Sequence, residues 1–244
     1  MIYGIRPAIE AIKSGKEIER IMLQQGLRGE GFQELFNLIR ELNIPFQYVP
    51  PERLNKLTRQ NHQGTVTVLS EITYHQLDQL VPSLFESGKN PLLMVLDQIT
   101  DVRNFGAMVR TAECAGVDAV VIPAHGAAPV NADAIKASAG ALFKLPVIKA
   151  VNLKEVLHFL KDSGLRIVAA NEKANTDFTA ENYTLPLTLI MGSEGSGVSE
   201  EYLKISDIQV RIPVYGEIGS LNVGVSAGIL LYEIIRQRQQ KGNA

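Results

Sequence analysis

The sequence predicts an α/β protein with mostly parallel sheets, divided into two domains. Segments with strand and helix periodicity alternate along the whole chain, which is the pattern of parallel sheets covered by helices. The chain has 244 residues, of which 45% are hydrophobic and 20% charged, enough for two modest cores. Turn-forming and helix-ending residues gather at 87–91. We therefore expect an N-terminal domain over 1–88 and a C-terminal domain over 89–244.

The N-terminal domain is expected to combine three strands with three helices. Alternating, β-branched segments predict strands at 18–24, 46–49 and 65–72. Apolar residues at helical spacing predict helices at 29–43, 50–59 and 74–88.

The C-terminal domain is expected to hold the larger sheet. The near-continuous apolar segment 92–99 is typical of a strand buried on both faces, so we place it at the centre. Further strands are predicted at 118–123, 146–151, 166–172, 187–192 and 208–214. Helices are predicted at 104–116, 131–144, 152–164 and 221–241.

Composition narrows the class of protein. With 24 Lys and Arg against 26 Asp and Glu, the net charge is −2, so a nucleic-acid partner would need a local basic patch. Cys114 is the single cysteine, which excludes an internal disulfide and fits the reducing cytoplasm. We expect no membrane insertion, because no secretory leader is evident and no apolar run approaches about 18 residues. The four scattered histidines predict no metal site.

Three loops at the carboxyl ends of predicted strands are candidates for a ligand site, because open α/β sheets bind ligands there. In the first loop, Asn104 stands where it can cap a helix, and Arg110 follows six residues later. The alternative is a plain helix cap and a solvated charge.

The second loop, at 192–200, is rich in glycine. It satisfies neither the dinucleotide pattern nor the phosphate-binding loop, because Val198 stands where the latter needs lysine. Its glycines allow the backbone to approach a ligand closely, with Glu194 as a polar group. A plain turn capped by Ser199 is the alternative.

The third loop leads into the last helix at 212–228. Ser220 and Asn222 offer polar groups at the helix start. Gly224 and Gly228 weaken a helix by about 1 kcal/mol each relative to alanine, so we expect another helix to pack closely there.

Together the three segments resemble the signature motifs of the SpoU, or TrmH, family of RNA ribose 2′-O-methyltransferases within the SPOUT class. Asn104–Ala112 is similar to N-x-G-A-x-x-R-T-A, and Met191–Gly197 is similar to M-G-S-E-G-x-G. Residues 212–216 and 220–223 are similar to I-P-x-x-G and S-L-N-V. The segments YGIRPAIEAI and NHQGTVTV look like the N-terminal domain of RlmB-type members. Arg6 departs from a histidine common in that subgroup, which leaves the RNA target open.

The resemblance implies a fold, a reaction and partners. It implies an L30e-like RNA-binding domain, a SPOUT catalytic domain with a deep trefoil knot, and a homodimer. The implied reaction is S-adenosylmethionine-dependent methylation of a guanosine ribose in 23S rRNA. A D-loop guanosine of tRNA and a non-catalytic RNA-binding protein are the alternatives. A nicotinamide-dependent oxidoreductase is disfavoured, because the segment LDQITDVRNFG lacks the dinucleotide fingerprint.

The resemblance also assigns roles to residues. The implied catalytic residues are Asn104, Arg110, Glu194, Ser220 and Asn222, and the implied cofactor-binding residues are Gly192, Ile212 and Leu221. Arg110 is implied to accept the hydroxyl proton. A guanidinium stays protonated above pH 12 or so, which suits a phosphate clamp better, and both roles stay open.

A basic patch is predicted in the N-terminal domain. Arg53, Lys56 and Arg59 recur every three residues, His62 follows, and no acidic residue intervenes. On a helix this spacing would align the three cations along one side, where they could meet successive RNA phosphates. The alternative is a solvated helix face.

Overall fold

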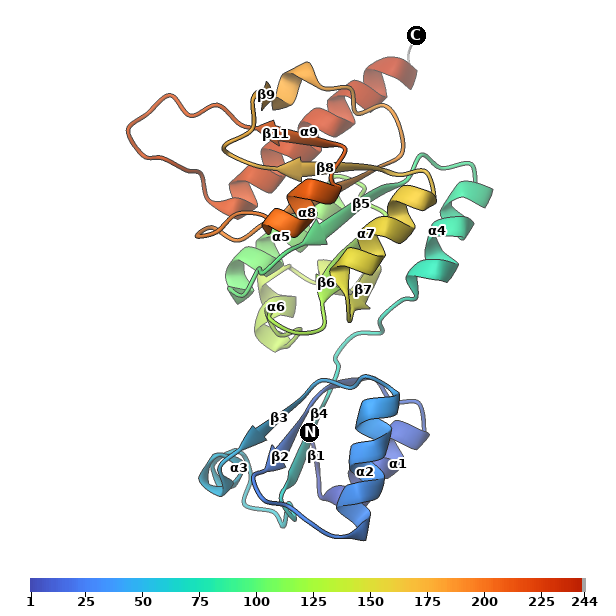
Figure 1. The fold of residues 1–244 in the computed structure, drawn as a ribbon, viewed down its shortest axis with the longest axis vertical. Helices are drawn as coiled ribbons and strands as arrows, with labels where there is room; N and C mark the ends of the chain where they lie inside the picture. Colours follow the sequence, from blue (N-terminus) through green and yellow to red (C-terminus); the bar gives the residue numbers. More distant parts are fainter. Residues whose placement is uncertain (243–244) are drawn as a thin grey trace. The chain divides into compact units, whose positions relative to one another are not determined.

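The chain divides into two compact units, one over Met1–Thr73 and one that begins at Tyr74. The computed structural model describes residues 1–242 (Figure 1). The expected boundary after residue 88 differs from this division, because helix α4 (Leu77–Glu86) packs its buried Val81 and Leu84 into the second core. The turn residues at 87–91 therefore connect two elements of one unit.

The first unit contains a four-stranded sheet in the order β1-β4-β2-β3. Its strands are β1 (Ile2–Tyr3), β2 (Ile18–Gln24), β3 (Phe46–Val49) and β4 (Thr65–Leu69). Strands β2 and β3 are parallel, whereas β4 runs antiparallel to both of its neighbours, which differs from the expected parallel arrangement. The helices are α1 (Ile5–Lys13), α2 (Glu30–Glu41) and α3 (Pro51–Leu57). Strand β1 and helix α1 are additions to the predicted elements.

The two faces of this sheet carry separate cores. Successive side chains of a strand point to opposite faces, so Ile21 and Leu23 of β2 face α1 and α2, while Met22 faces the other way. There Met22 packs with Leu54 of α3 and Val66 of β4. Strand β3 lies at an edge of the sheet, next to β2 alone.

The second unit contains a seven-stranded sheet in the order β7-β6-β5-β10-β8-β11-β9, with every pairing parallel. Its strands are β5 (Leu92–Leu96), β6 (Ala119–Pro123), β7 (Val147–Ala150), β8 (Arg166–Ala170), β9 (Thr176–Asp177), β10 (Leu187–Met191) and β11 (Ile208–Arg211). Strand β10, and not β5 as predicted, occupies the middle of the sheet. Strand β5 lies beside it, and both are buried along their whole length. The predicted α/β class with a parallel sheet is confirmed.

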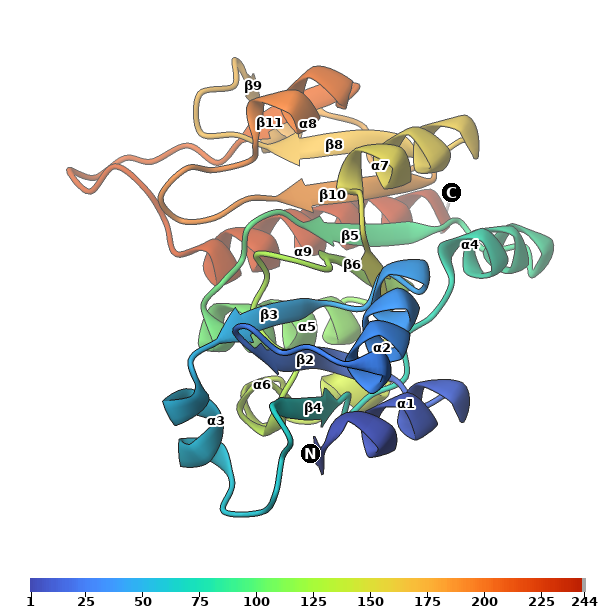
Figure 2. The same ribbon diagram turned by 60° about the horizontal axis from the view of Figure 1, so that its bottom comes forward.

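Helices cover both faces of the large sheet. They are α4, α5 (Val102–Cys114), α6 (Ala132–Ala137), α7 (Leu153–Asp162), α8 (Glu200–Ile205) and α9 (Val223–Gly242). Helices α4, α7 and α8 lie on one face and α5, α6 and α9 on the other (Figures 1 and 2). The single helix predicted at 131–144 stops at Ala137, because Ala139 and Gly140 adopt positive φ angles of 49° and 83°. Within the described residues, no helix has the length and apolar character needed to cross a membrane.

The strand order decides where the site forms. Strands β5, β10, β8 and β11 are neighbours and all run in the same direction, so their carboxyl ends meet at one edge. The loops that follow these four strands therefore gather there, although they are far apart in sequence.

The guanidinium of Arg238, near the end of α9, binds the chain at the amino ends of β5 and β10, which is the end of the sheet opposite these loops. Arg238 donates hydrogen bonds to the carbonyl oxygens of Asn90 at 2.7 Å, Pro91 at 3.2 Å, Tyr183 at 3.2 Å and Leu185 at 2.8 Å. These carbonyls belong to the segments that lead into β5 and β10. Arg238 thus ties the last helix to the two central strands.

Replacing Arg238 by alanine is expected to lower the free energy of unfolding of the second unit by about 1–3 kcal/mol, because four carbonyls each lose a hydrogen bond and, among the described residues, only that of Pro91 keeps another backbone donor, the amide of Leu187. Urea unfolding followed by circular dichroism measures this change. Gln239→Ala, at the exposed neighbouring position, is the control and should leave the midpoint unchanged. Equal midpoints for the two variants would contradict the assigned role.

Candidate active site

The loop after β10 is a tight turn whose geometry requires a glycine at its start. The amide of Gly197 donates to the carbonyl of Ser193 at 2.9 Å, and the amide of Ser193 donates back at 3.2 Å. A Cβ atom on Gly192 would lie 2.0 Å from the carbonyl carbon of Gly197 and 2.1 Å from the amide nitrogen of Val198. Gly192 is therefore required by the backbone of its own loop. Close approach to a ligand, the reason expected from the sequence, is not needed to explain it.

A buried carboxylate holds this turn against the neighbouring strand. Asp97 directly follows β5, is 3% exposed, and accepts a hydrogen bond from the amide of Ser199 at 2.7 Å. The next residue, Gln98, adopts a φ of 55° and donates to the Ser199 hydroxyl at 2.9 Å. Sequence reasoning missed Asp97. Its signal is an acidic residue placed directly after a fully apolar strand.

Helix α5 begins two residues earlier than predicted, and Asn104 does not cap it. The carboxylate of Asp101 accepts from the amides of Arg103 at 2.9 Å and Asn104 at 2.8 Å, so Asp101 is the cap. The Asn104 side chain is left available for other contacts.

Gly106 of α5 allows α6 to approach closely, because a Cβ there would lie 2.3 Å from the Cβ of Ala137.

Asn222 joins the three predicted loops through one side chain. Its Oδ1 accepts hydrogen bonds from the amides of Gly224 at 2.9 Å and Val225 at 3.3 Å, which caps α9. Its Nδ2 donates to Oδ1 of Asn104 at 3.0 Å and to a carboxylate oxygen of Glu194. A side-chain amide has two donor hydrogens and one acceptor oxygen, and here Asn222 uses both hydrogens and the oxygen. Asn104, Glu194 and Asn222 form one group, hereafter the junction cluster.

Arg110 lies apart from the junction cluster. It follows Asn104 by six residues, and at about 100° per residue the two side chains point roughly 120° apart around the helix. Arg110 is exposed and has no hydrogen bond or ion pair with the described residues. A single chain therefore does not bring all five predicted catalytic residues together.

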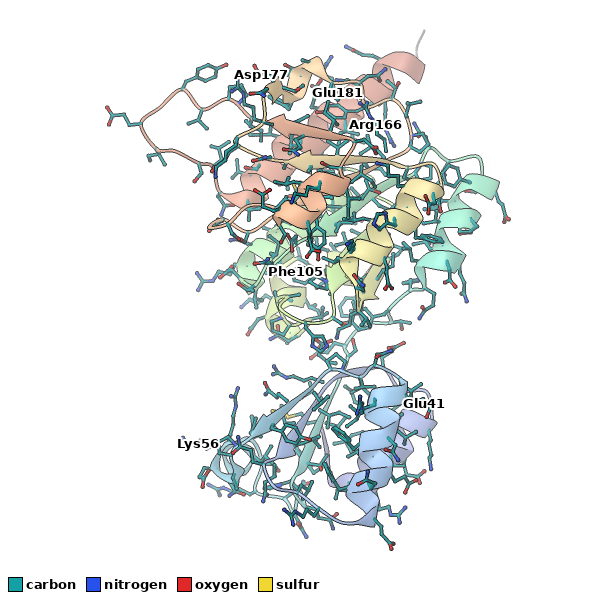
Figure 3. All side chains as sticks on the ribbon, in the orientation of Figure 1. Glu41, Lys56, Phe105, Arg166, Asp177 and Glu181 are labelled. Atoms are coloured by element: carbon teal, nitrogen blue, oxygen red, sulfur yellow. The ribbon has the colours of Figure 1, made fainter. Side chains whose placement is uncertain are left out.

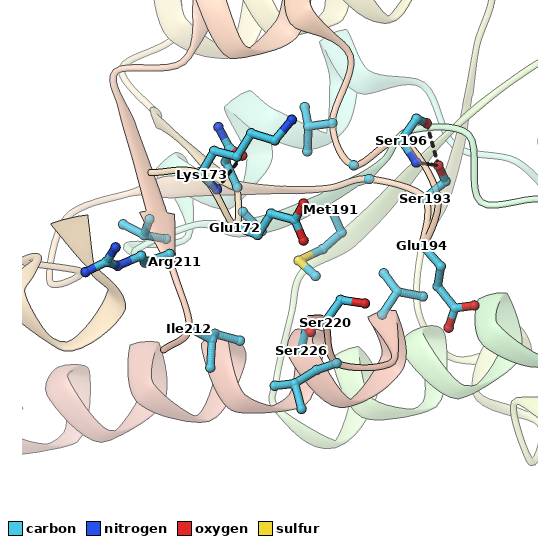
Figure 4. Close-up of a pocket in the computed structure, with 18 of the residues that line it drawn as sticks. Glu172, Lys173, Met191, Ser193, Glu194, Ser196, Arg211, Ile212, Ser220 and Ser226 are labelled. Atoms are coloured by element: carbon cyan, nitrogen blue, oxygen red, sulfur yellow. Dashed lines mark hydrogen bonds between the residues drawn. The ribbon is translucent and has the colours of Figure 1, made fainter. Parts of the chain in front are cut away.

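A pocket of about 210 Å³ opens at the carboxyl edge of the sheet (Figure 4). Its lining comes from the loops after β8, β10 and β11 and from the first turns of α9. Gly192, Ile212 and Leu221 all line it, together with Glu194 and Ser220. Figure 4 shows Ile212 and Ser220 on the side of α9, across from Glu172. The structure thus gathers the three predicted cofactor residues in one place.

A second pocket adjoins the first at the junction cluster. Residues 98–101, Asn104 and Gly126 line this space of about 570 Å³. Glu194, with its neighbours Ser193 and Gly195, lines both pockets. Two adjoining pockets with a polar group between them suit a reaction that brings two ligands together.

Two of the ionisable side chains that line the first pocket, Arg211 and Glu194, have polar partners. Arg211 lines the pocket and donates to Asp177 at 2.7 Å. Burial raises the pKa of Tyr202 on α8, and the carboxylates of Glu201 and Asp97 raise it further. This phenol therefore stays neutral near pH 7.

Two families match the sequence, one for each unit. Residues 91–232 match the SpoU rRNA Methylase family, and residues 1–75 match a domain described as RNA 2′-O ribose methyltransferase substrate binding. The first match spans more than half of the chain. This chain belongs to the SpoU rRNA methylase family. The predicted family and class of enzyme are confirmed.

Relatives of the SpoU-family chain agree with this placement. The putative TrmH family tRNA/rRNA methyltransferase YacO of Bacillus subtilis is 32% identical over 242 residues, which cover 99% of this chain and 97% of YacO. The SpoU methyltransferase AviRb of Streptomyces viridochromogenes, solved in complex with AdoMet, is 24% identical with a TM-score of 0.63. That alignment covers 98% of this chain and 90% of AviRb, and it shows a shared fold. A TrmH/SpoU tRNA modifying enzyme of A. aeolicus is 34% identical, with a TM-score of 0.57, over 68% of this chain and 86% of its own.

The predicted basic patch of the SpoU-family chain is only partly helical. Arg53 and Lys56 are exposed on α3, and Figure 3 shows Lys56 pointing outward. The helix ends at Leu57, so Arg59 lies beyond it and the three cations do not share one helix side. His62 accepts from the amide of Gly64 at Nδ1, 3.0 Å away, and its Nε2 lies 2.9 Å from Oδ1 of Asn55. Both ring nitrogens of His62 thus hold the loop itself.

Gly224 and Gly228 of α9 are half-buried and face α5. A Cβ on Gly224 would lie 3.7 Å from the Cβ of Ala107, and one on Gly228 would lie 3.7 Å from Cγ2 of Thr111. Helices α5 and α9 are therefore in contact here, but at ordinary van der Waals distance, so the expected need for glycine at these half-buried positions is not borne out. This contact gives no support to the predicted homodimer.

Gly192→Ala is expected to destabilise the SpoU-family fold by about 1–3 kcal/mol, because the added methyl overlaps the backbone of its own loop. Urea unfolding measures the loss. Gly195→Ala in the same loop is the matched control, since nothing lies within 4 Å of a Cβ there. If both variants unfold at the same urea concentration, the turn tolerates a side chain at 192 and the explanation fails.

Proposed function

We propose that this chain transfers a methyl group from S-adenosylmethionine to the ribose 2′-hydroxyl of a guanosine in 23S rRNA. The observation that carries the proposal is the junction cluster, which joins all three family motifs between two adjoining pockets. The name of YacO allows either tRNA or rRNA as substrate. The A. aeolicus tRNA modifying enzyme favours a second candidate, a D-loop guanosine of tRNA.

The first pocket is proposed to hold the methyl donor. S-adenosylmethionine supplies a methyl carbon bound to a positively charged sulfur. Apolar Ile212 and Leu221 and the backbone around Gly192 offer a site for an uncharged ring, and Glu194 and Glu172 place carboxylates in the lining. A lining of this kind fits a ligand that combines an uncharged base with a cationic centre.

The second pocket is proposed to hold the target nucleoside. Transfer forms a bond from the ribose oxygen to the methyl carbon as the carbon–sulfur bond breaks, and the hydroxyl proton passes to a base. Asn104, Asn222 and Glu194 would orient the hydroxyl where the pockets meet, and Ser220 would act beside them. Arg110 would either accept the proton or clamp the adjacent phosphate, and its permanent charge favours the clamp.

A homodimer is proposed through the outer surface of α5 and α9. On α9, Val225 is 52% and Tyr232 is 55% exposed. Ala107, Arg110 and Cys114 are exposed on the neighbouring helix α5. A two-fold interface over this surface would bury the apolar groups and place Arg110 at the subunit boundary. The predicted trefoil knot of the C-terminal segment and the L30e-like fold of the first unit stay predictions.

Methyl transfer tests the function directly. Purified protein is incubated with labelled S-adenosylmethionine and RNA from a deletion strain, and 2′-O-methylation is mapped in the 23S rRNA and tRNA fractions. Arg110→Ala is expected to abolish single-turnover transfer without weakening S-adenosylmethionine binding, because the arginine acts on the transition state. Arg103→Ala, exposed on the same helix, is the control and should keep wild-type turnover.

Three results would contradict these assignments. Label in tRNA alone would replace 23S rRNA by the second candidate. No label in any RNA would overturn the reaction. More than a tenth of the wild-type rate in Arg110→Ala would remove Arg110 from the chemistry.

The dimer surface is tested by adding charge to it. The variant with Val225→Lys and Tyr232→Lys is expected to sediment as a monomer of 26.7 kDa at micromolar concentration, because two ammonium groups would be buried. Phe85→Lys on α4, where Phe85 is 37% exposed, is the control and should leave the dimer intact. A fully active wild-type monomer would contradict the proposal.

A further inference from the structure

We propose that the first unit captures RNA by stacking unpaired bases on a stripe of four aromatic side chains. The stripe consists of Phe32 and Phe36 of α2 and Phe46 and Tyr48 of β3. This inference rests on the proposed function, because it takes RNA as the substrate. It adds to that function the surface that binds the RNA, which is the stripe, and the kind of contact, which is base stacking.

The four rings form one continuous series. Ring centroids are 5.6 Å apart for Phe32 and Phe36, 5.5 Å for Phe36 and Phe46, and 5.7 Å for Phe46 and Tyr48. The chain has eight Phe, seven Tyr and no Trp, so about a quarter of its aromatic rings lie in this stripe. Phe46 is 36% and Tyr48 is 47% exposed, so solvent reaches the end of the series on β3.

The position of β3 makes this exposure unusual. Phe46 and Tyr48 alternate with Gln47, so both rings point to the face of the sheet that α2 covers. Strand β3 is an edge strand, and edge strands commonly carry charged residues or proline that prevent unwanted pairing. Residues 46–49 contain neither. Phe32 and Phe36 are partly buried against the first core, whereas Phe46 and Tyr48 do not belong to it.

The charged side chains around the stripe do not repel a polyanion such as RNA. Gln33 and Arg40 lie on α2 at positions next to Phe36 and are exposed. Glu34 is turned toward α1, where it accepts hydrogen bonds from Lys13 at 2.8 Å and Arg6 at 3.2 Å. Figure 3 shows Glu41 on the side of α2 away from β3.

Charge alone does not explain capture by this unit. Residues 1–73 contain nine Lys and Arg against eight Asp and Glu, which leaves little attraction for phosphates beyond Arg53, Lys56 and Arg59. Stacking on an aromatic ring strengthens binding by about fivefold to a hundredfold per base and tolerates any base. The stripe therefore supplies the affinity that the balanced charge of the unit lacks.

Binding to a single-stranded 12-nucleotide oligouridylate tests the stripe in the full-length protein. The variant with Phe46→Leu and Tyr48→Leu is expected to bind at least tenfold more weakly, because leucine keeps the apolar packing but offers no ring. The slope of log affinity against log salt should stay at the wild-type value, because no phosphate contact changes. Replacing Arg53, Lys56 and Arg59 by alanine should instead lower that slope by about two to three units.

The matched control is Phe85→Leu, which removes a ring of similar exposure, 37%, from the second unit. Its affinity should equal that of the wild type. Urea midpoints confirm that each variant is folded. Wild-type RNA affinity in the double leucine variant would overturn the proposal. If the sedimentation coefficient of that variant also changed, the stripe would instead be an interface with another protein chain.

A direct signal comes from a single fluorophore. Because the chain has no tryptophan, Tyr48→Trp introduces one reporter at the exposed end of the stripe. Single-stranded RNA is expected to quench it, whereas a 12-base-pair duplex, whose bases are already stacked, should not. Equal quenching by both, or none, would contradict base stacking.

The outcome is separable from that of the proposed function. Methyl transfer to RNA with no quenching would leave the function standing and remove the stripe. Quenching with no methyl transfer would support the stripe and overturn the reaction.

Discussion

The hydrogen bonds of the Asn222 side chain are the interaction on which the candidate site depends. One amide caps the last helix and at the same time joins Asn104 to Glu194, which lie 118 and 28 residues away from it in the sequence. A carboxylate in place of this amide would accept at the helix start but could not donate to Glu194. Asparagine is therefore required by the geometry at this position.

The parallel sheet brings these residues within reach of each other. Strand β10 returns between β5 and β8, so the loops that follow β5 and β10 become direct neighbours. Asp97 uses this proximity to hold the Ser199 amide, and Gly192 lets the loop turn back on itself. At the other edge, Arg238 ties the last helix to the chain entering the same two strands. Both ends of the central strand pair are thus fixed by polar contacts.

The two units divide the proposed work between different physical interactions. The second unit offers two adjoining concave pockets with a glycine turn, apolar side chains and a polar junction, which suit the alignment of two ligands. The first unit offers open surface with exposed cations on α3 and exposed rings on β3. RNA is long, charged and partly unpaired, so a flat surface for the proposed capture and a concave site for the proposed chemistry are complementary.

The sequence by itself determined every strand of the large sheet except the two-residue β9, and it singled out the loops that line the two pockets, whereas β9 and helix α8 were not predicted. Apolar runs such as 92–96 become buried strands, because burial on both faces of a sheet excludes polar residues. The loop motifs can be found without the fold because each lies within one short segment of the sequence. Local pattern was less reliable at boundaries. Asp101, not Asn104, caps α5, and α3 ends before Arg59, because both outcomes depend on side-chain contacts that a spacing rule does not contain.

Only the tertiary structure decided which distant groups meet. Strand order brings Asn104, Glu194 and Asn222 together from three separate segments. The rotation of successive residues along α5 turns Arg110 away from them. The aromatic stripe likewise exists because β3 lies at an edge beside α2. Periodicity describes one segment at a time, whereas these contacts are set by the folding of segments against each other.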